Sequence, residues 1–155
     1  MNIRLLAAGT KPPGWVSEGF NEYQKRLPRE YQLILKEIKI AKRSRGEPVA
    51  NCKAEEGDRM LSAMDKDARV VAVDRQGSMW STRDLAQNLE NWATRHRTIN
   101  LLVGGPDGLA EQCLSVSHDC WSLSGLTFPH FLVRVIIAEQ LYRACSILSN
   151  HPYHR

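Results

Sequence analysis

The stretch WSLSGLTFPHFLVRVIIAEQLYRACSILSNHPYHR, residues 121–155, joins a turn-forming loop, a long apolar segment and a polar end. Between Phe131 and Leu148, 13 of 18 residues are apolar. A helix that is apolar on nearly every side must be buried on more than one side. The stretch therefore predicts a helix over residues 129–149 in a layered fold, with a second subunit as the simplest source of the further layer.

Two arginines interrupt this apolar segment and need partners, because an unpaired buried charge is costly. Glu139 precedes Arg143 by four residues, the spacing at which helix side chains pair. The charge that pairs with Arg134 or Arg143 could be a ligand carboxylate, an RNA phosphate or a partner carboxylate.

Upstream of this segment, apolar runs alternate with helical patterns. RVVAVD (69–74) and INLLV (99–103) are typical of buried parallel strands. Further strands are predicted at 2–8 and 33–40, and a brief strand or a loop at 122–123. Further helices are predicted at 15–26, 49–64, from Ser81 onward, and 109–116. This alternation predicts an α/β fold with a mainly parallel sheet.

Length and charge set broad limits on the class of protein. The 155 residues favour one domain over residues 1–155. At this size roughly 70% of the unfolded chain's surface can be buried on folding. The net charge of +4, from 21 Lys and Arg against 17 Asp and Glu, permits a polyanionic partner without requiring one.

The cysteines and the apolar runs indicate the compartment. The four cysteines form no CxxC pair, and no histidine stands at metal-ligand spacing from them, so we expect no metal site. The first apolar run is too short for a signal peptide. No stretch approaches the roughly 20 apolar residues of a membrane span. These features predict a protein of the reducing cytoplasm with no membrane partner.

Three predicted loops follow neighbouring strands and could form one pocket. They are the glycine loop GGPDG (104–108), the residues around Asp74, and SGLTFP (124–129). Open α/β sheets bind ligands at the carboxyl ends of their strands. The alternatives are a tight turn for the glycines and a turn-forming aspartate at Asp74, beside which the backbone near Val73 is the better ligand contact. Thr127 is a candidate cap for the following helix.

The glycine loop fits neither a GxGxxG motif nor a Walker A motif, which disfavours dinucleotide and nucleoside triphosphate binding. A small-molecule enzyme that binds a nucleotide is accordingly the weakest reading of the chain.

Two basic segments could contact nucleic acid. Lys42, Arg43 and Arg45 cluster in the loop 41–48, where the alternative is a solvated turn. In the tail NHPYHR (150–155), aromatic and cationic residues suit base stacking and phosphate contact, and the alternative is a solvated terminus. Its histidines can act near neutral pH, although a lone histidine is more often structural.

Over its full length the sequence resembles the ribosomal large-subunit methyltransferase H family, small SPOUT enzymes that modify a pseudouridine in 23S rRNA. The resemblance rests on AAGTKPPGWV (7–16), LLVGGPDGL (101–109), WSLSGLTFPH (121–130), LVRVIIAEQLYRA (132–144) and NHPYHR (150–155). Gly125 is a mild departure, since a small residue such as alanine is expected there.

The resemblance implies a SPOUT-type α/β fold, with a mostly parallel sheet, helices on both faces and a C-terminal trefoil knot. It implies S-adenosylmethionine as the cofactor, a homodimer, and 23S rRNA within the assembled 70S ribosome as the substrate. The implied cofactor contacts are Val73, Gly105, Ser124, Gly125, Leu126, Thr127, Phe128 and Pro129.

The implied reaction is methylation of N3 of the pseudouridine, which requires loss of the imide proton. We expect the tail to close over the base, with Tyr153 and His154 orienting it. Arg143 and Arg155 would hold a phosphate or the deprotonated imide, and His130 is the alternative base. The alternative function is a non-catalytic RNA-binding or ribosome-assembly module on the same scaffold.

Overall fold

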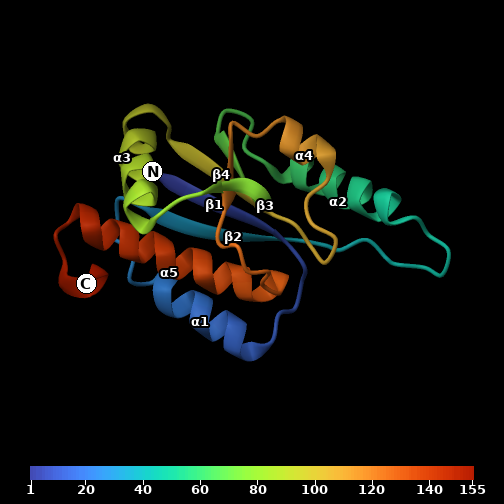
Figure 1. Cartoon of the computed structure of the whole chain (residues 1–155), viewed down its shortest axis with the longest axis horizontal. Helices are drawn as coiled ribbons and strands as arrows, with labels where there is room; N and C mark the ends of the chain where they lie inside the picture. Colours follow the sequence, from blue (N-terminus) through green and yellow to red (C-terminus); the bar gives the residue numbers. More distant parts are fainter.

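Five strands form one parallel sheet in the computed structural model, which describes residues 1–155 throughout (Figure 1). The strands are β1 (Asn2–Ala8), β2 (Gln32–Ile38), β3 (Arg69–Met79), β4 (Thr98–Val103) and β5 (Asp119–Ser122). Their order across the sheet is β2-β1-β4-β3-β5, and every neighbouring pair is parallel. All five carboxyl ends therefore lie at one edge.

Helices cover both faces of the sheet. They are α1 (Gly14–Gln24), α2 (Val49–Ala63), α3 (Thr82–Arg95), α4 (Glu111–Ser115) and α5 (His130–Leu148), followed by the 3-10 turn η1 (Pro152–His154). Figure 1 shows α1, α3 and α5 on one side of the sheet and α2 and α4 on the other. The predicted α/β fold with helices on both faces is confirmed.

Alternation along β1 explains the two cores. Ile3 and Leu5 point into the core under α1, α3 and α5, whereas Leu6 and Ala8 point into the core under α2 and α4. Successive strand residues face opposite sides, so a strand between two helical layers must be apolar throughout. This is why a continuous apolar run predicts a central strand.

Strand β3 extends further than the predicted 69–74 and reaches Met79. Its register with β5 shifts between Val73 and Ser78, so the strand carries an irregularity next to the predicted ligand loops. A side chain at Gly77 would place its Cβ 2.6 Å from the backbone of Cys120. Pairing with β5 keeps the polar end of β3 in the sheet, and it requires a glycine at position 77.

The predicted start of α3 is confirmed. The Ser81 hydroxyl accepts a hydrogen bond from the Asp84 N–H, and the Asp84 carboxylate accepts one from the Ser81 N–H. This reciprocal capping box satisfies two donors that the helix itself leaves free. Strand β2, predicted at 33–40, ends earlier, at Ile38.

Helix α5 packs against the sheet between α1 and α3, which supply part of the cover that its apolar sequence requires. Arg134 is fully buried on this helix and forms an ion pair with Glu37 of β2 at 2.8 Å. The same guanidinium donates to the carbonyls of Ala8 at 3.2 Å and Gly9 at 2.5 Å. The partner that Arg134 requires thus comes from its own chain. None of the helices combines the length and the apolar character needed to cross a membrane.

We expect Arg134→Met to lower the free energy of unfolding by about 3 kcal/mol, the lower end of the cost of breaking a buried ion pair. The lower end applies because the Glu37 side chain keeps 35% exposure and can be hydrated. Urea unfolding at a fixed protein concentration measures the loss. Arg95→Met, at an exposed position near the end of α3, is the matched control and should leave the midpoint unchanged. Equal midpoints for both variants would contradict this account of Arg134.

Candidate functional site

A cavity of about 590 Å³ lies at the carboxyl edge of the sheet, beside the N-terminus of α5. It is lined by the irregular segment of β3 that begins at Val73 and by the loops that follow β4 and β5, so the three predicted segments converge as expected. The lining includes Val73, Asp74, Gly104, Gly105, Leu109, Ser124, Leu126, Thr127, Phe128, Pro129 and His130. The volume falls within the range of small-molecule and cofactor sites, roughly 300–1,000 Å³.

The glycine loop closes on itself so tightly that side chains are excluded. Gly108 donates its N–H to the Gly105 carbonyl at 3.0 Å and adopts a φ of +84°. A Cβ added to Gly104 would lie 2.3 Å from the carbonyl carbon of Gly108. The loop therefore presents backbone, rather than side chains, to the cavity, and a ligand can approach it closely.

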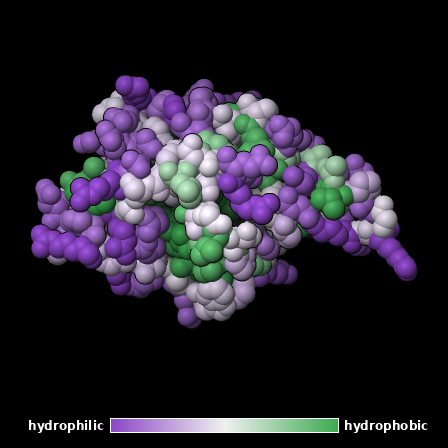
Figure 2. All heavy atoms as spheres, in the orientation of Figure 1, coloured by the Kyte–Doolittle hydropathy of each residue, from purple (hydrophilic) through white to green (hydrophobic).

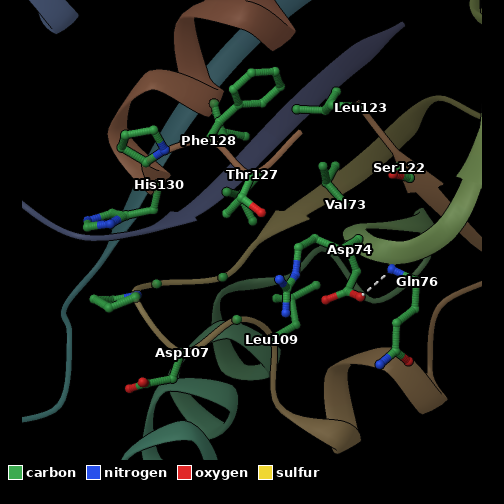
Figure 3. Close-up of a pocket in the computed structure, with 18 of the residues that line it drawn as sticks. Val73, Asp74, Gln76, Asp107, Leu109, Ser122, Leu123, Thr127, Phe128 and His130 are labelled. Atoms are coloured by element: carbon green, nitrogen blue, oxygen red, sulfur yellow. Dashed lines mark hydrogen bonds between the residues drawn. The ribbon is translucent and has the colours of Figure 1, made fainter. Parts of the chain in front are cut away.

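The loop between β5 and α5 forms the opposite wall. The Ser124 hydroxyl accepts a hydrogen bond from the Leu126 N–H at 3.0 Å, and Leu126 itself is 70% exposed. Figure 3 shows Thr127 and Val73 on facing sides of the hollow. The prediction that Thr127 caps α5 is wrong, because Pro129 is the N-cap residue and no side chain bonds to the first turn. The Thr127 hydroxyl is therefore free to meet a ligand.

The Asp74 side chain is engaged locally, in line with the turn reading. Its carboxylate accepts a hydrogen bond from the Gln76 N–H at 3.0 Å (Figure 3). The irregular segment of β3 thus offers the cavity an apolar side chain, Val73, next to a fixed carboxylate.

His130 is a side chain of this cavity with an unused hydrogen-bonding atom. Its Nε2 is buried and has no partner. Burial of the ring, followed by the positive charge of Arg134, lowers the pKa of His130 below its usual value. The imidazole is therefore neutral at pH 7, the form that can accept a proton.

The tail residues do not reach this cavity in their own chain. Arg143 and Tyr153 lie at the C-terminal end of α5, which Figure 1 shows at the opposite end of the helix from His130. Thirteen residues of helix separate His130 from Arg143, which corresponds to roughly 20 Å. The structure therefore separates the predicted site residues into a cavity group and a tail group.

The tail group is ordered by contacts with α5. Arg143 forms an ion pair with Glu139 at 2.6 Å, as predicted, and its guanidinium lies 4.9 Å from the centre of the Tyr153 ring. The Tyr153 hydroxyl lies 3.3 Å from a Glu139 oxygen, and its ring packs 4.5 Å from that of Tyr142. Burial, then hydrogen bonding with Tyr23, raises the pKa of Tyr153 to about 12, so this phenol stays protonated.

A second hollow of about 510 Å³ adjoins the tail and is basic. Arg83 of α3, Arg143 of α5 and His154 of the tail line it. Arg155 is exposed at the end of the chain. The chemistry of this hollow suits phosphate groups more than an apolar ligand.

Sequence reasoning missed Lys53 and Glu111, charged residues that line the larger cavity from α2 and α4. Glu111 stands three residues after the glycine loop, so its position in the sequence was a usable signal. Lys53 has no comparable signal, because α2 is brought to the cavity only by tertiary packing. Arg83, which lines the basic hollow, was likewise not predicted from the sequence. No group of three or more His, Cys, Asp or Glu side chains gathers in a way that would hold a metal ion.

Comparison with known proteins places the chain among methyltransferases. A family described as "Predicted SPOUT methyltransferase" matches residues 1–154. The ribosomal RNA large subunit methyltransferase H of Methylococcus capsulatus is 52% identical over 155 residues, covering 100% of this chain and 100% of that protein.

Two solved structures share the fold. A "probable methylase family protein from Haemophilus influenzae Rd KW20" matches with a TM-score of 0.54 at 14% identity, over 99% of this chain and 70% of the other. A methyltransferase from Legionella pneumophila, in complex with the bound cofactor SAM, matches with a TM-score of 0.50 at 9% identity, over 93% of this chain and 66% of the other. At these identities both structures bear on the fold alone.

We predict opposite outcomes for two glycines of the cavity loops. Gly104→Ala should weaken binding of S-adenosylmethionine at least tenfold and lower the melting temperature, because its Cβ meets backbone that cannot move aside. Gly125→Ala should leave both unchanged, since nothing lies within 4 Å of the added Cβ. Calorimetric titration and thermal unfolding measure the two quantities. A tolerated Gly104→Ala would show that the loop is looser than described.

Proposed function

The chain belongs to the ribosomal RNA large subunit methyltransferase H family of SPOUT methyltransferases, and we propose that it methylates N3 of a pseudouridine in 23S rRNA of the assembled ribosome. The observation that carries the proposal is full-length similarity to a large-subunit rRNA methyltransferase, in a chain whose three strand-end loops enclose one cavity. The proposal includes one SPOUT domain over residues 1–155 and a trefoil knot in its C-terminal part.

The cavity suits S-adenosylmethionine, which combines a flat apolar base with groups of both charges. Its lining offers apolar surface at Val73 and Phe128, exposed loop backbone at Gly105, and side chains of both signs at Lys53 and Asp74. Val73, Gly105, Ser124 and Leu126–Pro129 would hold the cofactor, which supplies an electrophilic methyl group on a sulfonium. Gly125, the remaining predicted contact, does not line the cavity.

His130 and Tyr153 would have different roles toward the target base. The neutral His130 imidazole would accept the N3 proton of the pseudouridine after its Nε2, which is buried beside Gly9, turns toward the base. Tyr153, whose raised pKa keeps the phenol protonated, can donate a hydrogen bond but cannot act as the base. A positioned base contributes roughly 10²–10⁴-fold to such a reaction.

A homodimer would bring the two groups of residues together. Val133, Ile136, Gln140, Arg143 and Ile147 follow one another along α5 at helical spacing and are all partly exposed. Val133 lines the larger cavity, and Gln140, Arg143 and Ile147 line the basic hollow. Figure 2 shows a hydrophobic area over the middle of α5, between these two sites. Two-fold packing along this row, with the helices running in opposite directions, would place each tail at the partner's cavity.

Each active site would then be built from residues of both protomers. One protomer would supply the cofactor loops and His130. Its partner would supply Arg143, Tyr153, His154 and Arg155 to hold the base and neighbouring phosphates. Positioning of this kind can provide much of the acceleration for a methyl transfer between bound reactants.

The function is tested by methyl transfer to purified ribosomes from a strain that lacks this modification. We expect the protein to transfer labelled methyl groups from S-adenosylmethionine to 23S rRNA, at one pseudouridine located by mass spectrometry. Calorimetry should detect cofactor binding in the absence of ribosomes. Binding of ribosomes without cofactor binding or methyl transfer would instead identify a non-catalytic assembly module.

The composite arrangement is tested with a heterodimer of two inactive variants. Thr127→Trp fills the cavity from an exposed position, and Tyr153→Ala removes the tail aromatic. A purified heterodimer of the two should regain close to half the parent activity, because it holds one intact cavity facing one intact tail. If each tail served its own chain's cavity, the heterodimer would be inactive. Homodimers of each variant are the controls.

A further inference from the structure

The loop between β2 and α2, residues 39–48, is joined to the glycine loop by Arg43. The Arg43 guanidinium forms an ion pair with Asp107 of the glycine loop at 2.6 Å and with Glu56 of α2 at 2.5 Å. It also donates a hydrogen bond to the Ala41 carbonyl at 2.8 Å. One side chain thus connects three separate parts of the chain.

Glu56 lies directly behind the glycine loop. It is only 4% exposed, and its Oε1 also accepts a hydrogen bond from the Ala41 N–H at 2.9 Å. Its Oε2 has no partner and lies 3.4 Å from the position of a Cβ on Gly105. A carboxylate buried against backbone needs a counter-charge, and Arg43 is the only cation that pairs with it.

Asp107 shows the direction from which the loop is held. Asp107 lines the larger cavity together with Gly105 and Gly108, and Figure 3 shows its side chain directed away from Val73 and Thr127. Arg43 does not line the cavity itself, and it holds the glycine loop through Asp107, a residue that does. A planar guanidinium that donates to two carboxylates through different nitrogens fixes orientation as well as distance, which a lysine cannot do.

The neighbouring cations of the same loop differ from Arg43. Lys42 and Arg45 are exposed and form no ion pair, so their charges remain available to a polyanion. The charge of Arg43, by contrast, is already paired with the carboxylates of Glu56 and Asp107 in the same chain. The three cations, which look equivalent in the sequence, are therefore unequal in the structure.

We propose that Arg43 is a positioning residue for the cofactor, holding the glycine loop in its binding conformation through Asp107 and Glu56, and that, of the three cations in the loop 39–48, only Lys42 and Arg45 meet rRNA phosphates. This inference rests on the proposed function, because it assigns the glycine loop to S-adenosylmethionine. It divides one basic loop into a part that serves the cofactor and a part that serves the ribosome.

The test measures cofactor affinity by calorimetry without ribosomes, and the salt dependence of ribosome binding. Arg43→Gln should raise the Kd for S-adenosylmethionine about tenfold, and Arg43→Lys should give an intermediate value. Lys42→Gln with Arg45→Gln should leave that Kd unchanged. This double variant should reduce the slope of log K against log salt for ribosomes by about 1.4–1.8, as expected for two lost phosphate contacts. Arg43→Gln should leave the slope unchanged.

Two further variants separate positioning from general destabilisation. Asp107→Asn should raise the Kd less than Arg43→Gln does. The double variant should bind the cofactor no more weakly than Arg43→Gln alone, since both substitutions remove the same contact between Arg43 and Asp107. Lys25→Gln, which removes an exposed ion pair with Glu22 outside this loop, should leave the Kd unchanged. Hydrogen exchange in residues 104–108 should accelerate in Arg43→Gln, which reports loop order in a folded protein.

The outcomes are distinguishable from failure of the proposed function. If the parent protein binds no S-adenosylmethionine, the proposed function itself is wrong. If the parent protein binds the cofactor and Arg43→Gln binds it equally well, only the role of Arg43 is overturned. The same holds if Arg43→Gln reduces the salt slope by as much as the loss of Lys42 or Arg45 does. Additive effects of Arg43→Gln and Asp107→Asn on the Kd would overturn it as well.

Discussion

A guanidinium buried at the centre of the molecule sets the position of helix α5, on which most of the other features depend. Arg134 joins this helix to Glu37 of β2 and to the backbone at the end of β1. A charge withdrawn from water can be accommodated only where all of these acceptors are in place, so the helix has one permitted placement on the sheet. That placement sets the start of α5 beside the glycine loop and its end roughly 27 Å away, where the tail folds back.

Patterns local in the sequence predicted the elements well, and contacts distant in the sequence decided the rest. The strands at 69–74 and 99–103 and the helix at 129–149 follow from apolar periodicity, and the capping box follows from Ser81 and Asp84. The extension of β3 to Met79 does not follow, because its polar residues enter the sheet only through pairing with β5. The cap assigned to Thr127 failed for a local reason, since the helix begins after Pro129 instead.

The candidate site shows the same division. The convergence of three strand-end loops was predictable, because parallel strands share an edge for their carboxyl ends. The partners of the arginines were not. Arg43 meets carboxylates 13 and 64 residues away, and Arg134 meets one 97 residues away, so no local pattern reports them. The separation of the tail from the cavity was available in principle, since the length of α5 alone sets it.

The order of the sheet also has a consequence for how the chain acquires its structure. Strand β1 pairs with β4 near the centre of the sheet, with Asn2 opposite Thr98. Almost two thirds of the sequence must therefore be synthesised before β1 can pair with β4. Contacts this distant in sequence slow folding, because the loop between them has to close before the pairing gives any stability. During synthesis, β1 therefore carries an unpaired, strongly apolar edge. Because exposed strand edges promote aggregation, the chain is vulnerable to it until β4 has been made.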